Sequence, residues 1–167
     1  HETEETLDWS ENGVVFGVKD QKRCGSCWAF SATGALESAV AIKTKQPPLD
    51  ISEQELVDCS GSYGNKGCGG GYMHFAYNYI LEHGINLSKD YPYNGHNNKC
   101  KSISGQGPVR MTGCVRQVPT VDGLIEALHV GPVAVGVFAD ILMYLYESGV
   151  FNIPQKMCDF EVDHGVL

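Results

Sequence analysis

The chain has 167 residues, 43% of them hydrophobic, which is enough for one packed domain or for two small lobes that share an interface. Twenty acidic and twelve basic residues give a net charge of −8, and no Lys or Arg cluster interrupts the acidic surface, so nucleic acid is not an expected partner. No apolar run reaches the roughly 18 residues of a membrane span. The acidic first residues also lack the apolar stretch of a signal peptide.

The cysteines are numerous and odd in number. Seven of them in this length indicate an oxidising compartment, with a disulfide framework and one unpaired thiol. A zinc site would also require cysteines, but the chain has no second CxxC pair at the spacing of zinc ligands, so we expect no metal. The sequon at 86–88 is typical of secreted proteins and predicts a glycan on Asn86.

The first predicted elements are helices. Residues 1–23 are expected to be irregular, and a helix then begins with Ser26 as its N-cap and Cys27 in its first turn. The helical spacing of three and four connects the apolar positions Trp28, Ala32, Ala35, Leu36, Ala39 and Val40. Two prolines at 47–48 end this pattern. A second helix is expected from Ser52, which forms a capping box with Glu55, while Ile51 and Leu56 form a hydrophobic staple.

The character of the sequence changes in its last third. A glycine-rich loop at 61–72 precedes a short helix at 73–83, which Gly84 ends. Beyond residue 107, segments 109–118, 132–138 and 162–167 have the β-branched or alternating pattern of strands, and 121–131 has that of an amphipathic helix. We therefore predict an α+β fold with a mainly helical lobe at 1–112, a β-rich lobe at 113–167 and a cleft between them.

The pair of cysteines in "KRCGSCWAF" has several possible functions. At a helix N-terminus, unpaired N–H groups and the helix dipole would stabilise a Cys27 thiolate and make it a nucleophile. A redox dithiol of Cys24 and Cys27 is an alternative, although no βαβ pattern precedes it. Two ligands of a metal site, or two members of buried disulfides, are further alternatives. The residues alone leave all four open.

Several motifs in order resemble those of the papain-like cysteine proteases, and of their cathepsin L-like branch in particular. They are "LDW" near the start, "DQKRCGSCWAFS", "ISEQELVDC", "CGGGYM", "YPY" and "VDHGVL", which together cover nearly the whole chain. The resemblance implies a two-lobe fold with the active site in the cleft. It also implies an endopeptidase that works without a cofactor and is made as a zymogen.

The resemblance assigns a role to three residues of the catalytic centre. Cys27 matches the nucleophile, and His164 matches the histidine that exchanges protons with it, 137 positions later (164 − 27). Gln21 matches the glutamine whose amide stabilises the oxyanion together with the backbone N–H of Cys27. Outside this resemblance, Gln21 would be an ordinary loop residue, and His164 one of six histidines.

The same comparison assigns substrate and disulfide positions. Gly70 and Gly71 match glycines along which a peptide lies, since only residues without a side chain permit that approach. Tyr72 and Met73, unless they are simply core residues of the next helix, line the pocket for the second side chain upstream of the cut, with Gly136, Val162, Asp163 and Gly165. We expect that pocket to prefer Leu, Phe or similar side chains. The implied disulfides are Cys24–Cys68 and Cys59–Cys100, and parity permits Cys114–Cys158.

The resemblance also implies residues that this sequence does not contain. Family members continue for several tens of residues, with an asparagine that orients the histidine and a tryptophan that shields their bond. Neither Glu161 nor Asp163 is an obvious substitute. We expect the remainder to be a separate light chain, or the sequence to be a fragment, and an inactive scaffold that binds peptides or a partner protein is the alternative function. We further expect polypeptide substrates, protein inhibitors of the cystatin type, no association with a membrane, and a lysosomal, vacuolar or secreted location.

Overall fold

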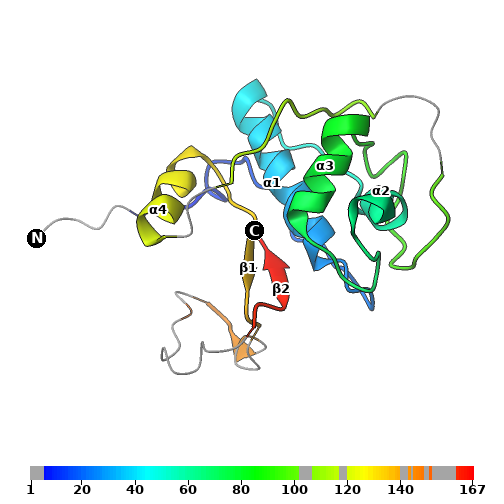
Figure 1. Ribbon diagram of the computed structural model, residues 1–167. Coiled ribbons are helices and arrows are strands. Elements are labelled where there is room, and N and C mark those ends of the chain that lie inside the picture. Colours follow the sequence, from blue (N-terminus) through cyan, green and yellow to red (C-terminus); the bar gives the residue numbers. More distant parts are fainter. Residues whose placement is uncertain are drawn as a thin grey trace, which may run out of the picture.

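The computed structural model describes residues 6–101, 107–116, 120–139, 143, 145–148, 151 and 161–167. Its helices are α1 (Cys27–Thr44), α2 (Glu53–Cys59), α3 (Met73–His83) and α4 (Val121–Val130), with a 3-10 helix, η1 (Ser60–Tyr63), after α2. Strands β1 (Val135–Val137) and β2 (His164–Val166) form an antiparallel pair. Figure 1 shows α1, α2 and α3 grouped together, with α4 and the two strands on another side of α1. The predicted α+β composition is confirmed.

Helix α1 runs through the middle of the helical part. Ser26 is its N-cap, as predicted, but the Ser26 hydroxyl makes no capping bond and instead pairs with the hydroxyl of Tyr93 at 2.7 Å. The predicted apolar stripe is only partly right, because Ala39 is exposed while polar Glu37 and Ser38 are buried. A helix that is enclosed on most sides does not need a single apolar face.

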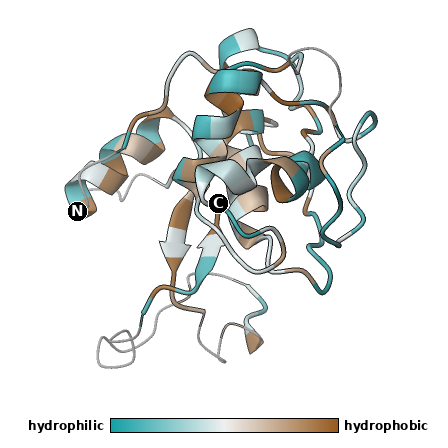
Figure 2. Ribbon diagram, turned by 45° about the vertical axis from the view of Figure 1, so that its right-hand side comes forward, coloured by the Kyte–Doolittle hydropathy of each residue, from teal (hydrophilic) through white to brown (hydrophobic). Residues whose placement is uncertain are grey.

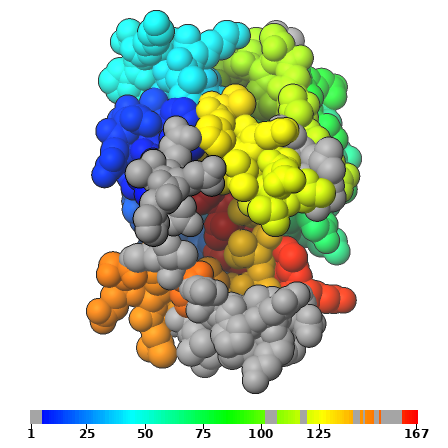
Figure 3. Space-filling model, turned by 90° about the vertical axis from the view of Figure 1, so that its left-hand side faces the viewer, coloured from blue at the N-terminus to red at the C-terminus, as the bar shows by residue number. Residues whose placement is uncertain are grey.

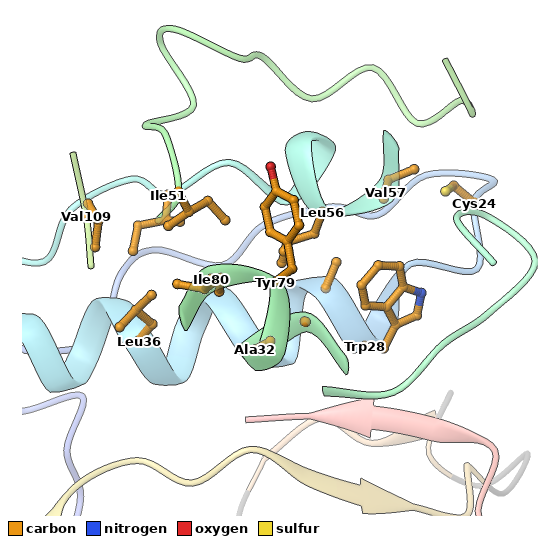
Figure 4. Packing of buried hydrophobic residues seen from close by; sticks show 13 residues of the cluster. Cys24, Trp28, Ala32, Leu36, Ile51, Leu56, Val57, Tyr79, Ile80 and Val109 are labelled. Carbon is orange, nitrogen blue, oxygen red and sulfur yellow. The ribbon is translucent and has the colours of Figure 1, made fainter. Parts of the chain in front are cut away.

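Helices α2 and α3 complete the core around α1. The Ser52 hydroxyl accepts a hydrogen bond from the backbone N–H of Glu55 at 3.0 Å, which confirms the predicted start of α2. The reciprocal half of the capping box is absent, because the N–H of Ser52 donates to the carbonyl of Asn86. Helix α3 ends at Gly84, whose φ of +70° favours glycine. Figure 4 shows side chains of all three helices in one cluster: Trp28, Ala32, Leu36, Leu56, Val57, Tyr79 and Ile80.

A half-buried cation, Lys19, holds the arm before α1 against the helices. The ammonium group of Lys19 lies 2.7 Å from Glu37 and 2.7 Å from Glu53, and 2.9 Å from the more exposed Asp50. Burial disfavours the charge of Lys19, but attraction to Glu53 and Glu37 outweighs it and raises its pKa. Burial also raises the pKa of Glu37, and the hydrogen bond and the charge of Lys19 offset this rise only in part.

The last third of the chain contains less strand than the sequence predicts. Within the described part of 109–118, only Val109 forms a bridge, to Ile85, because the neighbouring residues have no strand beside them. The strand predicted at 132–138 is confirmed only at 135–137, and the one at 162–167 only at 164–166. Gly136 is paired with Gly165, and Val137 with His164. The division into lobes at 1–112 and 113–167 stays a prediction.

Helix α4 confirms the amphipathic helix that the sequence predicts. The Thr120 hydroxyl caps it by accepting a bond from Gly123 N–H at 3.1 Å. Figure 3 shows α4 in yellow on the surface, near the blue N-terminal arm, and Trp9 Nε1 donates to the carbonyl of Leu128 at 2.7 Å. Leu124, Ile125 and Leu128 are partly exposed, and Figure 2 shows hydrophobic residues along this helix. Among the described residues, no helix has the length and apolarity needed to cross a membrane.

Candidate active site

Cys27 is the first residue of α1 and carries a free, half-buried thiol. Its position is fixed by the segment before it. Cys24 is joined to Cys68 by a disulfide, and the N–H of Gly25 donates to the carbonyl of Cys68 at 3.0 Å. A side chain on Gly25 could not fit, because its Cβ would lie 2.7 Å from that carbonyl oxygen. The thiol therefore stands at a helix N-terminus, where the dipole favours a negative charge.

His164 is the first residue of β2, and that strand lies along the N-terminal half of α1. The Ser31 hydroxyl donates to the carbonyl of Val166 at 2.7 Å. A Cβ on Gly165 would lie 3.4 Å from the backbone N and Cα of Trp28, which shows how closely β2 approaches the helix. These contacts bring the last residues of the chain to the start of α1, and His164 and Cys27 line the same cavity.

This cavity has a volume of about 300 Å³. All eight residues that the sequence predicts to bind substrate line it together with Cys27 and His164: Gly70, Gly71, Tyr72, Met73, Gly136, Val162, Asp163 and Gly165. Its lining also contains Trp28, Gly64, Lys66 and Gly69, which the sequence analysis did not predict as site residues. The glycine-rich composition of 61–72 was the available signal for three of these four, and Trp28 is the residue after the nucleophile.

The glycine-rich wall of the cavity is held from behind by Asn65, which is 5% exposed. The side-chain oxygen of Asn65 accepts from the N–H of Tyr72 at 2.8 Å, and its side-chain nitrogen donates to the hydroxyl of Ser60 at 2.9 Å. Gly71 passes so near that a Cβ would lie 2.3 Å from the Asn65 oxygen. Gly70 has a φ of +106°, a conformation that side chains disfavour. At Gly69, Gly70 and Gly71 the wall thus presents backbone to the cavity.

Gln21 does not line this cavity. It borders a neighbouring one of about 660 Å³, which shares Gly165 with the first and is also lined by Ser31 and Val166. Its amide nitrogen donates to the carbonyl of Cys24 at 3.0 Å. An amide nitrogen has two N–H bonds, so this contact uses only one of them.

The other acidic and sulfur groups near the site have structural partners. The Asp163 carboxylate accepts from the N–H of Ala139 at 2.8 Å, and so acts as a partner of the backbone beside β1. Because Cys24 is bonded to Cys68, the redox dithiol of Cys24 and Cys27 is excluded. The described residues contain no cluster of three or more His, Cys, Asp or Glu side chains arranged for a metal.

The remaining cysteines follow the pairing that the resemblance implies as far as the structure describes them. Cys59 and Cys100 are joined by a disulfide, and Cys114 is a free, exposed thiol. Cys158, its possible partner by parity, lies outside the described residues.

Asn86 is a poor glycan acceptor in the folded chain. The residue is 8% exposed, and its side-chain nitrogen, the atom that would carry the sugar, donates to the buried carboxylate of Glu55 at 3.0 Å. The backbone N–H of Asn86 donates to the same carboxylate oxygen at 2.8 Å. The glycosylated nitrogen would keep one N–H, but a sugar needs space that a residue with 8% exposure does not offer, so the glycan stays a prediction that this burial disfavours.

Comparison with known proteins places the chain among cysteine proteases. Residues 3–167 match the model of a family described as papain family cysteine protease. Cathepsin S of Mus musculus is 45% identical over 172 residues, which cover 98% of this chain and 49% of that protein. Digestive cysteine proteinase 3 of Homarus americanus is 43% identical over 164 residues, which cover 96% of this chain and 50% of that protein. The chain thus spans about half the length of the curated relatives it matches.

Two solved structures have the same fold. A digestive procathepsin L 3 from the larval midgut of Tenebrio molitor superposes with a TM-score of 0.87 at 37% identity, over 95% of this chain and 52% of that one. The Carica candamarcensis cysteine protease CMS1MS2, solved with E-64, superposes with a TM-score of 0.83 at 36% identity, over 95% of this chain and 73% of that one.

Proposed function

Because this chain belongs to the papain family of cysteine proteases, we propose that it hydrolyses peptide bonds through a thioester on Cys27, with His164 as the proton carrier. One observation carries the proposal. Cys27 and His164 come from opposite ends of the chain, yet they line one cavity together with a wall of glycine backbone. A nucleophile, a group that transfers protons and a surface for an extended peptide are the parts that acyl transfer requires.

The proposed reaction has two steps, acylation of Cys27 and hydrolysis of the resulting thioester. The Cys27 thiolate attacks the carbonyl carbon of the peptide bond, and the imidazolium of His164 gives its proton to the departing amine, which leaves a thioester on the sulfur. A water molecule then gives a proton to His164 and attacks the thioester. The carbon–sulfur bond breaks, the product acid departs, and the thiolate and imidazolium are restored.

The negative oxygen that forms in both steps needs donors near the start of α1. We assign that role to the backbone N–H of Cys27 and to the second N–H of the Gln21 amide, whose first is directed to Cys24. Loss of one such donor typically costs about 10²–10³ in kcat.

The proposed substrate is a polypeptide with an apolar side chain at the second position upstream of the cut. Met73, Val162 and two glycines bound that part of the cavity. The Met73 sulfur would lie 3.3 Å from a Cβ on Gly165, and Val162 Cγ1 would lie 2.7 Å from one on Gly136, so larger residues at either glycine would fill the space. Leu or Phe in the substrate fits an apolar lining of this kind.

The inhibitors, a partner chain and the location are proposed from the membership of the family. Cystatin-type proteins are the expected inhibitors, and a separate light chain is a proposed partner. The two disulfides suit folding in an oxidising compartment, which agrees with a lysosomal, vacuolar or secreted location.

The test uses the two free thiols of the described chain, since Cys114 is exposed and serves as an internal reference for Cys27. The protein is alkylated with iodoacetamide at pH 5 and at pH 8.5, and the labelled peptides are quantified by mass spectrometry. An unassisted thiol reacts mainly as the pH approaches about 8.5. We expect Cys27 to be labelled much faster than Cys114 at pH 5, and the two to be similar at pH 8.5.

A His164→Ala variant should lose the fast labelling at pH 5 and keep that at pH 8.5. Hydrolysis of a peptide with Leu at the second upstream position should be lost in both His164→Ala and Cys27→Ser. Equal labelling of Cys27 and Cys114 at both pH values would contradict the proposal and favour a scaffold that binds peptides without cleaving them.

A further inference from the structure

The hydroxyl of Tyr93 connects the two segments that carry the proposed oxyanion donors. It donates to the backbone carbonyl of Gln21 at 2.7 Å and shares a hydrogen bond with the hydroxyl of Ser26 at 2.7 Å. Ser26 is fully buried and immediately precedes Cys27. One hydroxyl, from a residue far along the chain, therefore fixes Gln21 relative to the start of α1.

The ring of Tyr93 is itself held in place. Its edge-to-face contact with Phe30 has a centroid distance of 4.9 Å, and the ammonium group of Lys22 lies 5.9 Å from the ring centroid. Burial raises the pKa of Tyr93, so the hydroxyl keeps the proton that it donates. A packed ring with a protonated hydroxyl can therefore hold the carbonyl of Gln21 and the hydroxyl of Ser26 in fixed positions.

The turn that Tyr93 supports contains few other long-range links. Within it, the carbonyl of Cys24 accepts both from the Gln21 side chain at 3.0 Å and from the N–H of Ser26 at 2.8 Å. These bonds are local. The links to the rest of the fold are the Cys24–Cys68 disulfide and the bond from the Gly25 N–H to the Cys68 carbonyl in the middle, and Tyr93 at the two ends.

We propose that Tyr93 is a positioning residue that sets the distance between the Gln21 amide and the N–H of Cys27 for the oxyanion. The inference rests on the proposed function, because it concerns that same site. Tyr93 does not line the cavity, so it acts through Gln21 and Ser26. Loss of Tyr93 should therefore weaken steps in which negative charge develops on the carbonyl oxygen. It should leave the reactivity of the Cys27 thiolate and the binding of the peptide unchanged.

The experiment compares Tyr93→Phe with Tyr91→Phe in the full chain. Phenylalanine keeps the ring packing and removes only the hydroxyl. Tyr91 is a matched control, because its hydroxyl is also hydrogen-bonded but to other residues: it donates to Asp58 at 2.9 Å, accepts from the N–H of Lys101 at 3.2 Å and lies 3.9 Å from the Cys59 sulfur. Three probes are used: iodoacetamide, which needs no oxyanion donor; a peptide aldehyde, which forms an oxyanion-like adduct with the thiol; and the corresponding peptide alcohol, which forms none.

We expect the Tyr93→Phe variant to bind the aldehyde about 10- to 100-fold more weakly, since small misplacement of a catalytic group costs up to about 10²-fold. Alcohol affinity and the alkylation rate of Cys27 should be unchanged, and with a peptide substrate kcat should fall while KM is retained. In a Gln21→Ala background, the effect of Tyr93→Phe on aldehyde binding should be smaller than in the native chain.

Unchanged aldehyde affinity in Tyr93→Phe would overturn the inference. So would an equal loss in Tyr91→Phe, or a parallel loss of alkylation and alcohol binding, since either would indicate a general effect on the fold. If the native chain shows no fast alkylation and no aldehyde binding, the proposed function fails and the inference fails with it.

Discussion

Replacing Lys19 by alanine should destabilise the fold by about 3–5 kcal/mol, because it leaves buried carboxylates without their cation. The side chains of Glu37 and Glu53 are 1% and 2% exposed, and each lies 2.7 Å from the Lys19 ammonium group. After the substitution, Glu37 keeps the N–H of Ile51 and Glu53 keeps the hydroxyl of Thr33, both at 2.8 Å. Hydrogen bonds from neutral groups compensate a buried charge only in part.

The expected loss is a large share of the free energy of unfolding, which is typically about 5–15 kcal/mol for a domain. It should also depend on pH in a particular direction. Burial already raises the pKa of Glu37 in the native chain, and removal of Lys19 would raise it further. The folded variant would then bind more protons than the unfolded one, so its deficit should shrink as the pH falls from 7 towards the pKa of the carboxylates.

Urea unfolding followed by tryptophan fluorescence measures the effect, since Trp28 is 1% exposed in the core. With a slope of about 1–3 kcal/mol per molar urea, the midpoint should move by at least about 1 M. Lys89→Ala is the matched control, because Lys89 and Asp90 form an exposed pair at 3.7 Å, of a kind worth about 0–1 kcal/mol. Equal effects of the two substitutions at pH 7, or a Lys19→Ala deficit that grows as the pH falls, would refute the reasoning.

Three further predictions concern the site wall, a helix cap and a buried hydroxyl. Gly71→Ala places a Cβ 2.3 Å from the Asn65 oxygen and should cost about 1–3 kcal/mol in urea unfolding and weaken peptide-aldehyde binding; unchanged binding would mean that Asn65 can move aside. Ser52→Ala removes the cap of α2 and should cost about 0.5–2 kcal/mol by thermal unfolding, whereas Ser52→Asn, which keeps a capping oxygen, should cost less if capping dominates. Burial and the hydrogen bond to Asp58 raise the pKa of Tyr91 to about 12, so its contribution to stability is present below its ordinary value of 10.0 and lost as the pH rises towards 12. Tyr91→Phe should therefore flatten the fall in unfolding free energy across that interval.

The helices were predictable because their signals are local. Ser52 and Gly84 mark helix ends through their own backbone chemistry, and the structure uses both in that way. The stripe on α1 was predicted less well at Ala39. Which faces of a central helix are covered depends on segments distant in sequence, such as the arm that brings Lys19 to Glu37, and periodicity carries no information about them.

The strands were overpredicted for a related reason. A β-branched run such as 132–138 favours extended backbone, but a strand forms only where a neighbour is paired with it, and β2 pairs with three residues of that run. The residues of the cavity were identified through the resemblance, since nothing in the spacing of Gly136 and Val162 indicates that they line one cavity with Met73. The bonds of Asn65 and Tyr93 remained unpredicted because they join side chains to backbone groups of other segments.

Because of the Cys24–Cys68 disulfide, the two walls of the cavity differ in how firmly they are attached to the segment that carries Cys27. This disulfide fastens the nucleophile segment to the glycine-rich wall by a covalent bond, three residues before Cys27 and one before Gly69. Among the described residues, the wall with His164 is held to α1 by noncovalent contacts such as the Ser31–Val166 hydrogen bond. When the cavity widens, the thiol and the glycine wall must therefore travel as one piece while the imidazole moves away from both. Opening motions of the cavity would thus separate the Cys27 sulfur from the His164 imidazole before they changed the glycine-rich wall on which a peptide lies.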